Sequence, residues 1–287
     1  MKKVKEKRRT NDVWLRLKKN KLALIGLAIL ALLFLIALLG DVMFDYEAQV
    51  IKQDIPNRLQ SPSAEHWFGT DGFGRDLFAR VMYGTRYSLA VGFITAFGAL
   101  IAGGTLGCLA GYFGGMLDAV IMRCLDILMA IPSVVLAIAL VTVMGTGFNN
   151  LVIALAISNI PVFTRLLRSS ILSIKNQEYI ESAHCSGVGT ARIIIRHILP
   201  NCMGPIIVQA TFTVATAILS SAGLSFLGVG VEPPAPEWGT LLSEGREFMR
   251  YKPYLVIIPG CFIAATVLAL NLAGDGLRDA LDPRLKK

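Results

Sequence analysis

The side chains of this chain that are best suited to metal chemistry lie in one polar stretch. Between Arg165 and Pro205 the sequence places His184 and Cys185 next to each other, shortly after Glu181. An imidazole and a thiol side by side suggest a metal site. However, neighbouring residues on a helix point about 100° apart, so the two poorly share one ion, and no second pair supports them. The stretch therefore indicates packing or contact with a partner.

Motifs that would mark an enzyme or an ATPase are absent from the sequence. No GxxxxGK[ST] occurs, so the chain has no Walker A loop to hold ATP, and HExxH, GxSxG and CxxC are also missing. Gly69, Gly72 and Gly74 do not form the GxGxxG phosphate cradle. The five cysteines lie mostly in or beside apolar runs, as small packing residues do. We therefore expect no catalytic residue, metal or cofactor on this chain.

The composition is that of a membrane protein. Of 287 residues, 54% are hydrophobic and 17% are charged, and the mean hydropathy is +0.59. A soluble domain carries about 25% charged residues. The net charge of +8 does not indicate nucleic-acid binding, because ten of the 28 Lys and Arg residues lie between Lys2 and Lys21, directly before the first apolar run. Only Trp14 offers a base-stacking ring there. The expected partner is the lipid bilayer.

Six apolar segments are long enough to cross a bilayer as helices, which predicts an all-α polytopic membrane protein. The first is too long for a secretory signal peptide and no small-residue cleavage site follows, so it should remain as an anchor. The second is rich in glycine, which lets membrane helices pack closely, and Pro132 should kink the third. The spans are expected at about Leu22–Leu39, Tyr87–Ala110, Ala119–Met144, Asn150–Leu167, Pro205–Val229 and Tyr254–Leu272.

The distribution of Lys and Arg predicts the orientation. Six spans place both termini on one side of the membrane. With that side inside, 20 of the 28 basic residues lie in inside segments and eight in outside segments. Positively charged segments stay in the cytoplasm, so we expect both termini and the central polar loop to be cytoplasmic.

The central loop should contain two short helices. Asn176 is expected to cap the first, and Gly187 suits the left-handed position at which such a helix ends. Thr190 is expected to cap a second, amphipathic helix that Pro200 prevents from continuing. Near the third span, Arg123 and Asp126 can form an ion pair, since they are three residues apart.

The pattern in this loop resembles the cytoplasmic "EAA" loop of permease subunits in bacterial binding-protein-dependent ABC importers. The matching residues are Glu181, Ser182, Ala183, Gly187, Leu199 and Pro200. Ser182 replaces the usual first alanine with another small residue, and His197 stands where isoleucine is common. In that family the loop receives mechanical work from a separate ATPase, so the resemblance implies an ATPase-coupling role for these six residues.

Blocks on the other side of the membrane resemble the dipeptide and oligopeptide branch of the same family. They contribute the external-loop residues Gly69, Thr70, Asp71, Gly74, Arg75, Asp76, Pro234, Glu237, Trp238 and Gly239. From the residues alone, Asp71 to Arg86 is expected to form an interfacial turn and helix, with Leu77, Phe78, Val81 and Met82 facing lipid. Trp238 is expected to be an aromatic anchor at the membrane interface.

The resemblance implies a type I ABC importer permease fold and half of a translocation pathway for dipeptides or oligopeptides. It implies residues 1–85 as basic terminus, anchor and external segment, 86–275 as permease domain with the coupling loop 175–204, and 276–287 as cytoplasmic tail. It also implies a bacterial cytoplasmic-membrane location and three kinds of partner: a sister permease, two ATPase subunits that use ATP and Mg²⁺, and an extracytoplasmic binding lipoprotein or periplasmic protein. Nickel chelates and glutathione are alternative cargoes. The rival class, an ion-coupled carrier, would need a buried acid–base chain that the apolar spans lack.

Overall fold

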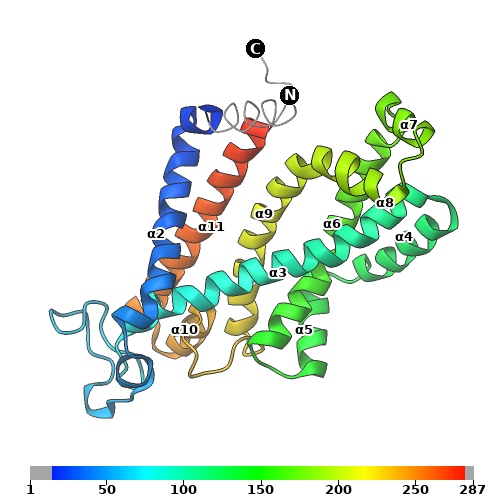
Figure 1. Cartoon of the computed structure of the whole chain (residues 1–287). Helices are drawn as coiled ribbons and strands as arrows, with labels where there is room; N and C mark the ends of the chain where they lie inside the picture. Colours follow the sequence, from blue (N-terminus) through cyan, green and yellow to red (C-terminus); the bar gives the residue numbers. More distant parts are fainter. Residues whose placement is uncertain (1–14, 282–287) are drawn as a thin grey trace.

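The computed structural model describes residues 15–281, and this part of the chain is helical with irregular connections (Figure 1). Most of the basic cluster predicted before the first span, and the tail from residue 282, lie outside the described residues. The α-helices are α2 (Lys21–Met43), α3 (Leu77–Phe113), α4 (Gly115–Met129), α5 (Ser133–Met144), α6 (Phe148–Ile174), α7 (Glu178–Cys185), α8 (Thr190–Ile193), α9 (Leu199–Phe226), α10 (Trp238–Gly245) and α11 (Tyr254–Leu281). Short π or 3-10 turns are η1 (Tyr46–Ile51), η2 (Ile55–Asn57), η3 (Ile194–Ile198) and η4 (Arg246–Phe248).

Within residues 15–281, five helices are long and apolar enough to cross a membrane, or six if the bent pair α4 and α5 counts as one span. The predicted third span is therefore not one continuous helix: α4 and α5 meet at an angle of 86°. Pro132 explains the break, because it lacks an N–H and disfavours helical backbone at the residue before it. The kink predicted at this proline is confirmed, and it is sharp enough to separate two helices.

The second span begins earlier than predicted. Asp76 caps α3, since its Oδ1 accepts a hydrogen bond from the N–H of Ala79 at 2.9 Å, and the helix starts at Leu77 rather than near Tyr87. The expectation that Leu77 and Val81 face lipid is wrong, because both are buried in a core cluster shared with α2, α9, α10 and α11. Phe78 and Met82 are half-buried.

Close helix packing depends on glycine where it was expected. Cβ atoms added to Gly103 and Gly107 on α3 would lie 2.5 Å from the carbonyl oxygen of Ile160 and 2.6 Å from that of Thr164, both on α6. A real Cβ does not tolerate such distances, so a side chain at either position would push α3 and α6 apart. These two glycines therefore set the separation of the helices.

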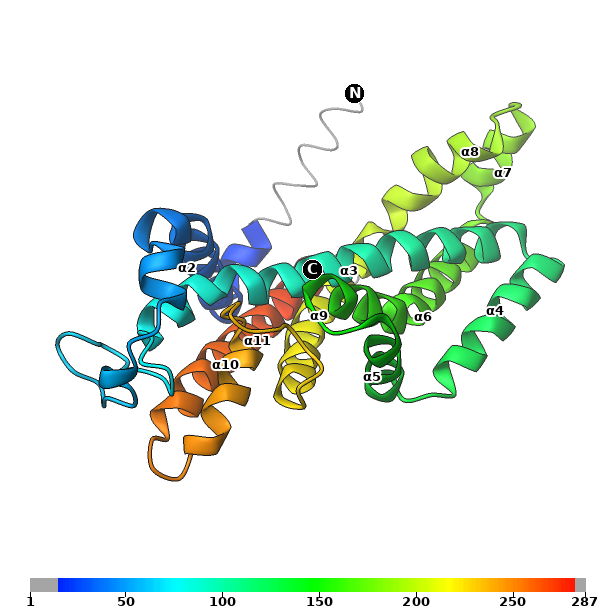
Figure 2. The ribbon, with the colours of Figure 1, turned by 90° about the horizontal axis from the view of Figure 1, so that it is seen from below.

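Different segments of the chain lie at the two ends of the molecule. The start of α2, the end of α11 and helix α7 lie toward one end, whereas residues 44–76 and α10 lie toward the other (Figure 1). Figure 2 shows α3 running across the molecule between the group α2, α10 and α11 and the group α4, α6 and α7. The loop 175–204 and the segment 44–76 therefore lie toward opposite ends of the molecule, as the predicted six-span topology requires.

Candidate functional site

Helix α7 stands on the predicted coupling loop and is held by one buried side chain. Ile180 is 1% exposed and packs into an apolar cluster at the base of the loop. The predicted Asn176 cap is wrong: Gln177 occupies the N-cap position and makes no side-chain capping bond. Burial of Ile180 therefore positions α7, in place of a side-chain cap. Its buried partners are Leu167, Ile171, Ile193, Ile198, Cys202 and Ile206.

The turn after α7 has the geometry predicted for Gly187. Its φ is +71°, in the left-handed region that favours glycine. The N–H of Val188 donates to the carbonyl of Ala183 at 3.1 Å, and the N–H of Gly187 donates to that of His184 at 2.9 Å. Together these bonds form a Schellman motif, with Val188 and Ala183 packed on the cluster below. The turn is thus locally stable, and its direction is well defined.

The opposite face of α7 is exposed. Glu181 and Ser182 are exposed and Ala183 is half-buried, and a Cβ added to Gly187 would meet no atom within 4 Å. His184 is also exposed, and its Nε2 lies 3.0 Å from the hydroxyl of Tyr112 on α3. Small and polar groups therefore form a free surface at the end of the molecule.

The second half of the loop differs from its prediction. Gly189, not Thr190, is the N-cap of α8, and Pro200 does not stop the helix: α8, η3 and α9 form one helical run. The π turn η3 explains this outcome, because the N–H of Leu199 bonds to the carbonyl of Ile194, five residues back. The chain enters α9 with Pro200 in its first turn, where a missing N–H is tolerated. Leu199 is half-buried and Pro200 exposed.

Ion pairs join α4 to α6, the helix that leads into the loop 175–204. Arg168 makes two hydrogen bonds to Asp118, at 2.6 and 2.7 Å, and Arg165 donates to Asp126 at 2.8 Å. The predicted pair between Arg123 and Asp126 is therefore wrong, because Asp126 faces α6. These contacts link α6 with α4, the helix that precedes the break at Pro132.

At the other end of the molecule, Asp71 and Arg75 belong to a buried ion network. Asp71 Oδ2 accepts from Arg75 Nε at 2.6 Å and from Arg80 Nη1 at 2.8 Å. Glu244 Oε2 accepts from Arg75 Nη2 at 2.8 Å and from Arg80 Nη1 at 2.5 Å. Arg80 has no exposed surface and Arg75 is 3% exposed. Two cations and two anions thus join the external block to α10. The sequence did not single out Glu244, since the pairing spans more than 160 positions.

Other residues of the external block shape its backbone. Thr70 Oγ1 donates to the carbonyl of Asn57 at 2.6 Å and accepts from the N–H of Gln60 at 2.8 Å. Gly69 and Gly74 have φ of +79° and +77°, and a Cβ at Gly74 would lie only 1.8 Å from a backbone oxygen. Asp76, besides capping α3, contacts His66 Nδ1 at 2.7 Å. These residues form a compact structural unit before α3.

The loop that enters α10 is more buried than the sequence indicates. Trp238 is completely buried: its indole N–H donates to the carbonyl of Val81 at 3.0 Å, so the predicted interface anchor is wrong. Glu237 caps α10 by accepting from the N–H of Thr240 at 3.0 Å, and burial raises the pKa of its carboxyl. A Cβ at Gly239 would lie 2.5 Å from Ala222, and Pro234, although exposed, accepts from Arg80 Nη2 at 3.4 Å. This loop therefore locks onto α3 and α9.

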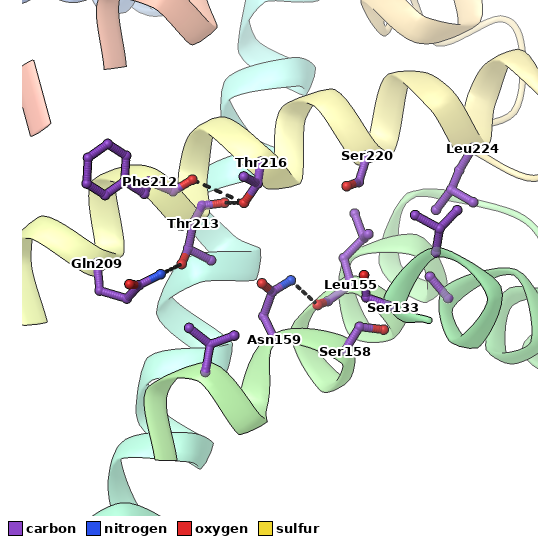
Figure 3. A pocket seen from close by; sticks show the side chains of 13 residues that line it. Ser133, Leu155, Ser158, Asn159, Gln209, Phe212, Thr213, Thr216, Ser220 and Leu224 are labelled. Carbon is purple, nitrogen blue, oxygen red and sulfur yellow. Dashed lines mark hydrogen bonds between the residues drawn. The ribbon is translucent and has the colours of Figure 1, made fainter. Parts of the chain in front are cut away.

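A cavity of about 290 Å³ lies between α5, α6 and α9 (Figure 3). Its polar residues were not identified from the sequence, although serine, threonine and carboxamide side chains within apolar spans are a signal that could have found them. The lining residues are Ser133, Val134, Ala137, Leu155, Ser158, Asn159, Val162, Gln209, Phe212, Thr213, Thr216, Ser220 and Leu224. None of these side chains is charged.

Several membrane-crossing helices, a polar cavity at mid-helix and an exposed helix between two spans define a membrane transport subunit. Residues 103–287 match the family model described as "Binding-protein-dependent transport system inner membrane component", and residues 9–62 match "N-terminal TM domain of oligopeptide transport permease C". The chain belongs to this family of ABC importer permeases, which are transport components rather than enzymes. It is an integral inner-membrane protein that works with ATPase and binding-protein partners.

Individual relatives extend the match to nearly the whole chain. The dipeptide transport system permease protein DppC of Alkalihalophilus pseudofirmus is 50% identical, over 96% of this chain and 90% of the relative. The glutathione transport system permease protein GsiD of Pectobacterium atrosepticum is 44% identical, over 96% and 91%. A chain of the inward-facing MetNI methionine ABC transporter shares the fold, with a TM-score of 0.58 and 19% identity, over 71% of this chain and 97% of that chain.

Proposed function

We propose that this chain forms half of a translocation pathway for dipeptides and receives the work of ATP hydrolysis through α7. The observation that carries the coupling role is the exposed small and polar face of α7, held on an apolar base and followed by the Gly187 turn. The cargo is supported by the names of the relatives, since the dipeptide permease DppC is 50% identical. Glutathione, the cargo named for GsiD at 44% identity, is the second candidate.

The path for movement runs through rigid elements. An ATPase that grips α7 pulls on α6 and on the helical run from α8 to α9, because Ile180 packs on both. Arg165 and Arg168 pass a movement of α6 to α4. Beyond the break at Pro132, α5 lines the cavity together with α6 and α9. A tilt that begins at α7 therefore changes the walls of the cavity, as alternating access requires.

The complete importer is proposed to contain a sister permease, two ATPase subunits and an extracytoplasmic binding protein. Residues 86–275 would form the shared permease domain, with residues 1–85 as the added anchor and external segment and 276–287 as a tail. Both termini and residues 175–204 would be cytoplasmic. Reporter fusions at Lys175 and Pro234 test this orientation, and finding both on one side of the membrane contradicts it.

Substitution of Gly187 tests the coupling role. Gly187→Trp should leave membrane insertion intact while ATP-driven uptake by the reconstituted importer is lost, because the indole occupies the surface that meets the ATPase. Gly187→Asn should retain more activity, since asparagine tolerates the left-handed backbone. Unchanged uptake in Gly187→Trp contradicts the assignment.

Gly228 provides a matched control at the other end of the molecule. Its φ is +80°, a Cβ there meets no atom within 4 Å, and it ends α9 with the same pair of backbone bonds, from Gly228 to Ser225 and from Val229 to Leu224. Gly228→Trp therefore carries a similar local strain. It should still co-purify with the ATPase subunits, whereas Gly187→Trp should not.

A further inference from the structure

The cavity between α5, α6 and α9 lies among apolar helices, yet seven of its thirteen lining residues are polar. Asn159 is near the centre of the 27-residue helix α6, and Gln209, Thr213 and Ser220 follow one another along α9. Figure 3 shows these α9 side chains on one side of the space and Asn159 and Ser158 of α6 on the other. At this depth a polar group is costly when it lacks a hydrogen-bond partner, so unused donors and acceptors here mark a place for a ligand or a partner group.

Several of these polar groups keep hydrogen-bonding capacity that faces the cavity. The amide nitrogen of Asn159 donates to the carbonyl of Leu155 at 2.8 Å, which holds the side chain and leaves its Oδ1 free to accept. The nitrogen of Gln209 is 3.4 Å from Thr213 Oγ1, and its Oε1 also remains an acceptor. Within residues 15–281, the hydroxyls of Ser133 and Ser220 have no hydrogen-bond partner. The cavity thus offers acceptors for N–H groups and donors for carbonyls.

The absence of charge from the lining limits what the cavity can select. Among the described residues, none that lines it is acidic, basic or a histidine. An amino or carboxyl terminus of a peptide finds no counter-charge there, whereas its amide bond finds complementary partners. Weak, neutral contacts also suit a passage, since cargo must leave as readily as it enters. With about 290 Å³, the space is near the lower end of the ~300–1,000 Å³ typical of small-molecule sites.

We propose that this cavity is a transit site that holds the amide bond of a short peptide, with Asn159 and Gln209 as its main contacts. This proposal rests on the proposed function and adds the group of the cargo that is recognised. The site would treat peptides alike whatever the charge of their side chains. Dipeptides and glutathione share the amide group, so the chemistry is the same for both cargoes.

Leucine variants of the two carboxamides test the proposal in the fully reconstituted importer with saturating binding protein. Asn159→Leu and Gln209→Leu should each lower dipeptide uptake about fivefold, the factor that one net hydrogen bond contributes. ATPase activity stimulated by the binding protein should stay within about twofold, because α7 and its base are untouched. Thr142→Leu is the control, since it removes a hydroxyl from α5 at a position outside the lining of the cavity.

A charge placed in the cavity tests its neutrality. Asn159→Asp should create a preference for a dipeptide with a lysine side chain over one with a glutamate, by about fivefold relative to the wild type. Uptake of glutathione and of a neutral dipeptide is measured in the same preparations.

Three outcomes overturn the proposal alone. The first is unchanged uptake when Asn159→Leu and Gln209→Leu are combined in one variant. The second is an equal loss of uptake and of stimulated ATPase activity, which marks a structural role such as contact with a side chain of the sister permease. The third is the absence of a charge preference in Asn159→Asp. If the wild-type importer carries neither dipeptides nor glutathione, the proposed function fails and the transit site fails with it.

Discussion

The buried ion network between residues 71–80 and α10 supports a quantitative prediction about Arg80. This side chain has no exposed surface and donates to both Asp71 and Glu244, so Arg80→Met leaves two carboxylates beside the single cation of Arg75. Breaking a buried, hydrogen-bonded ion pair costs about 3–5 kcal/mol of stability, because the remaining charge is desolvated and unpaired. Asp71 and Glu244 side chains are only 6% and 17% exposed, so water cannot compensate for much of this cost.

The loss should be visible as a lower unfolding temperature of the detergent-solubilised protein. A change of 1 kcal/mol shifts the transition by roughly 2–4 °C in chains of about 150–250 residues, so Arg80→Met should lower it by roughly 6–20 °C. Thermal unfolding monitored at one fixed heating rate measures this shift, since membrane proteins often unfold irreversibly. Arg58→Met is the control, because this exposed arginine has no place in the network, and it should stay within about 0.5 kcal/mol of the wild type.

A second substitution separates charge imbalance from lost packing. Glu244→Met combined with Arg80→Met removes one charge of each sign, and the double variant should be less destabilised than the sum of the single variants, by about 0.5–3 kcal/mol. If Arg80→Met lowers the transition no more than Arg58→Met, the network does not hold the external block to α10 and the reasoning is refuted.

Three further substitutions test other contacts of the fold. Trp238→Phe should cost about 1–3 kcal/mol, because the indole N–H bond to the carbonyl of Val81 is lost and a void opens, while Thr85 Oγ1 still donates to that carbonyl; Trp67→Phe, at an indole that is 65% exposed, is the control, and equal melting of the two variants contradicts the buried role. Gly107→Val should cost about 1–3 kcal/mol by forcing α3 from α6, whereas Gly98→Val on the same helix should be mild, since its nearest atom lies at 3.5 Å; similar losses at both positions would show that the contact with α6 is not limiting. Burial raises the pKa of the Glu237 carboxyl in the folded protein above its ordinary value of 4.5, so its contribution to stability is full below that value and is lost as the pH rises through the folded pKa. Glu237→Gln keeps an acceptor for the α10 cap and should therefore melt higher than the wild type at pH 8, with the difference shrinking toward pH 5; a difference that does not vary with pH argues against the raised pKa.

The membrane class and the positions of most spans were accessible from local sequence, because a helix that crosses a bilayer needs about 20 predominantly apolar residues. The backbone preferences of glycine and proline, which are also local, predicted the left-handed conformation at Gly187 and the kink at Pro132. The proline rule failed at Pro200, where a π turn between Ile194 and Leu199 lets the helix continue. The π turn is a local change of hydrogen bonding, but Ile193 and Ile198, which flank it, are buried in the apolar cluster below α7, and this packing favours it.

Predictions about facing directions failed where only distant contacts decide them. Leu77, Val81 and Trp238 are apolar residues near a membrane boundary, and the sequence pattern fits lipid exposure as well as burial. The structure buries them because α10 packs against α3. The ion pair between Arg75 and Glu244 also depends on this packing, since the two residues are more than 160 positions apart in the sequence. In the same way, Asp126 pairs with Arg165 of α6 and not with its neighbour on α4.

The sequence by itself determined that this chain crosses a membrane in about six helices, carries a polar loop with a glycine turn between two of them and has no motif for holding ATP. These properties follow from composition and short-range spacing, which act within a few residues. Only the tertiary structure decided which polar side chains meet. It brought Ser133, Asn159 and Gln209 from three helices around one neutral cavity, and it enclosed Asp71, Arg75, Arg80 and Glu244 in one network. Such groupings depend on how whole helices cross, and contacts between residues far apart in the sequence decide most of that geometry.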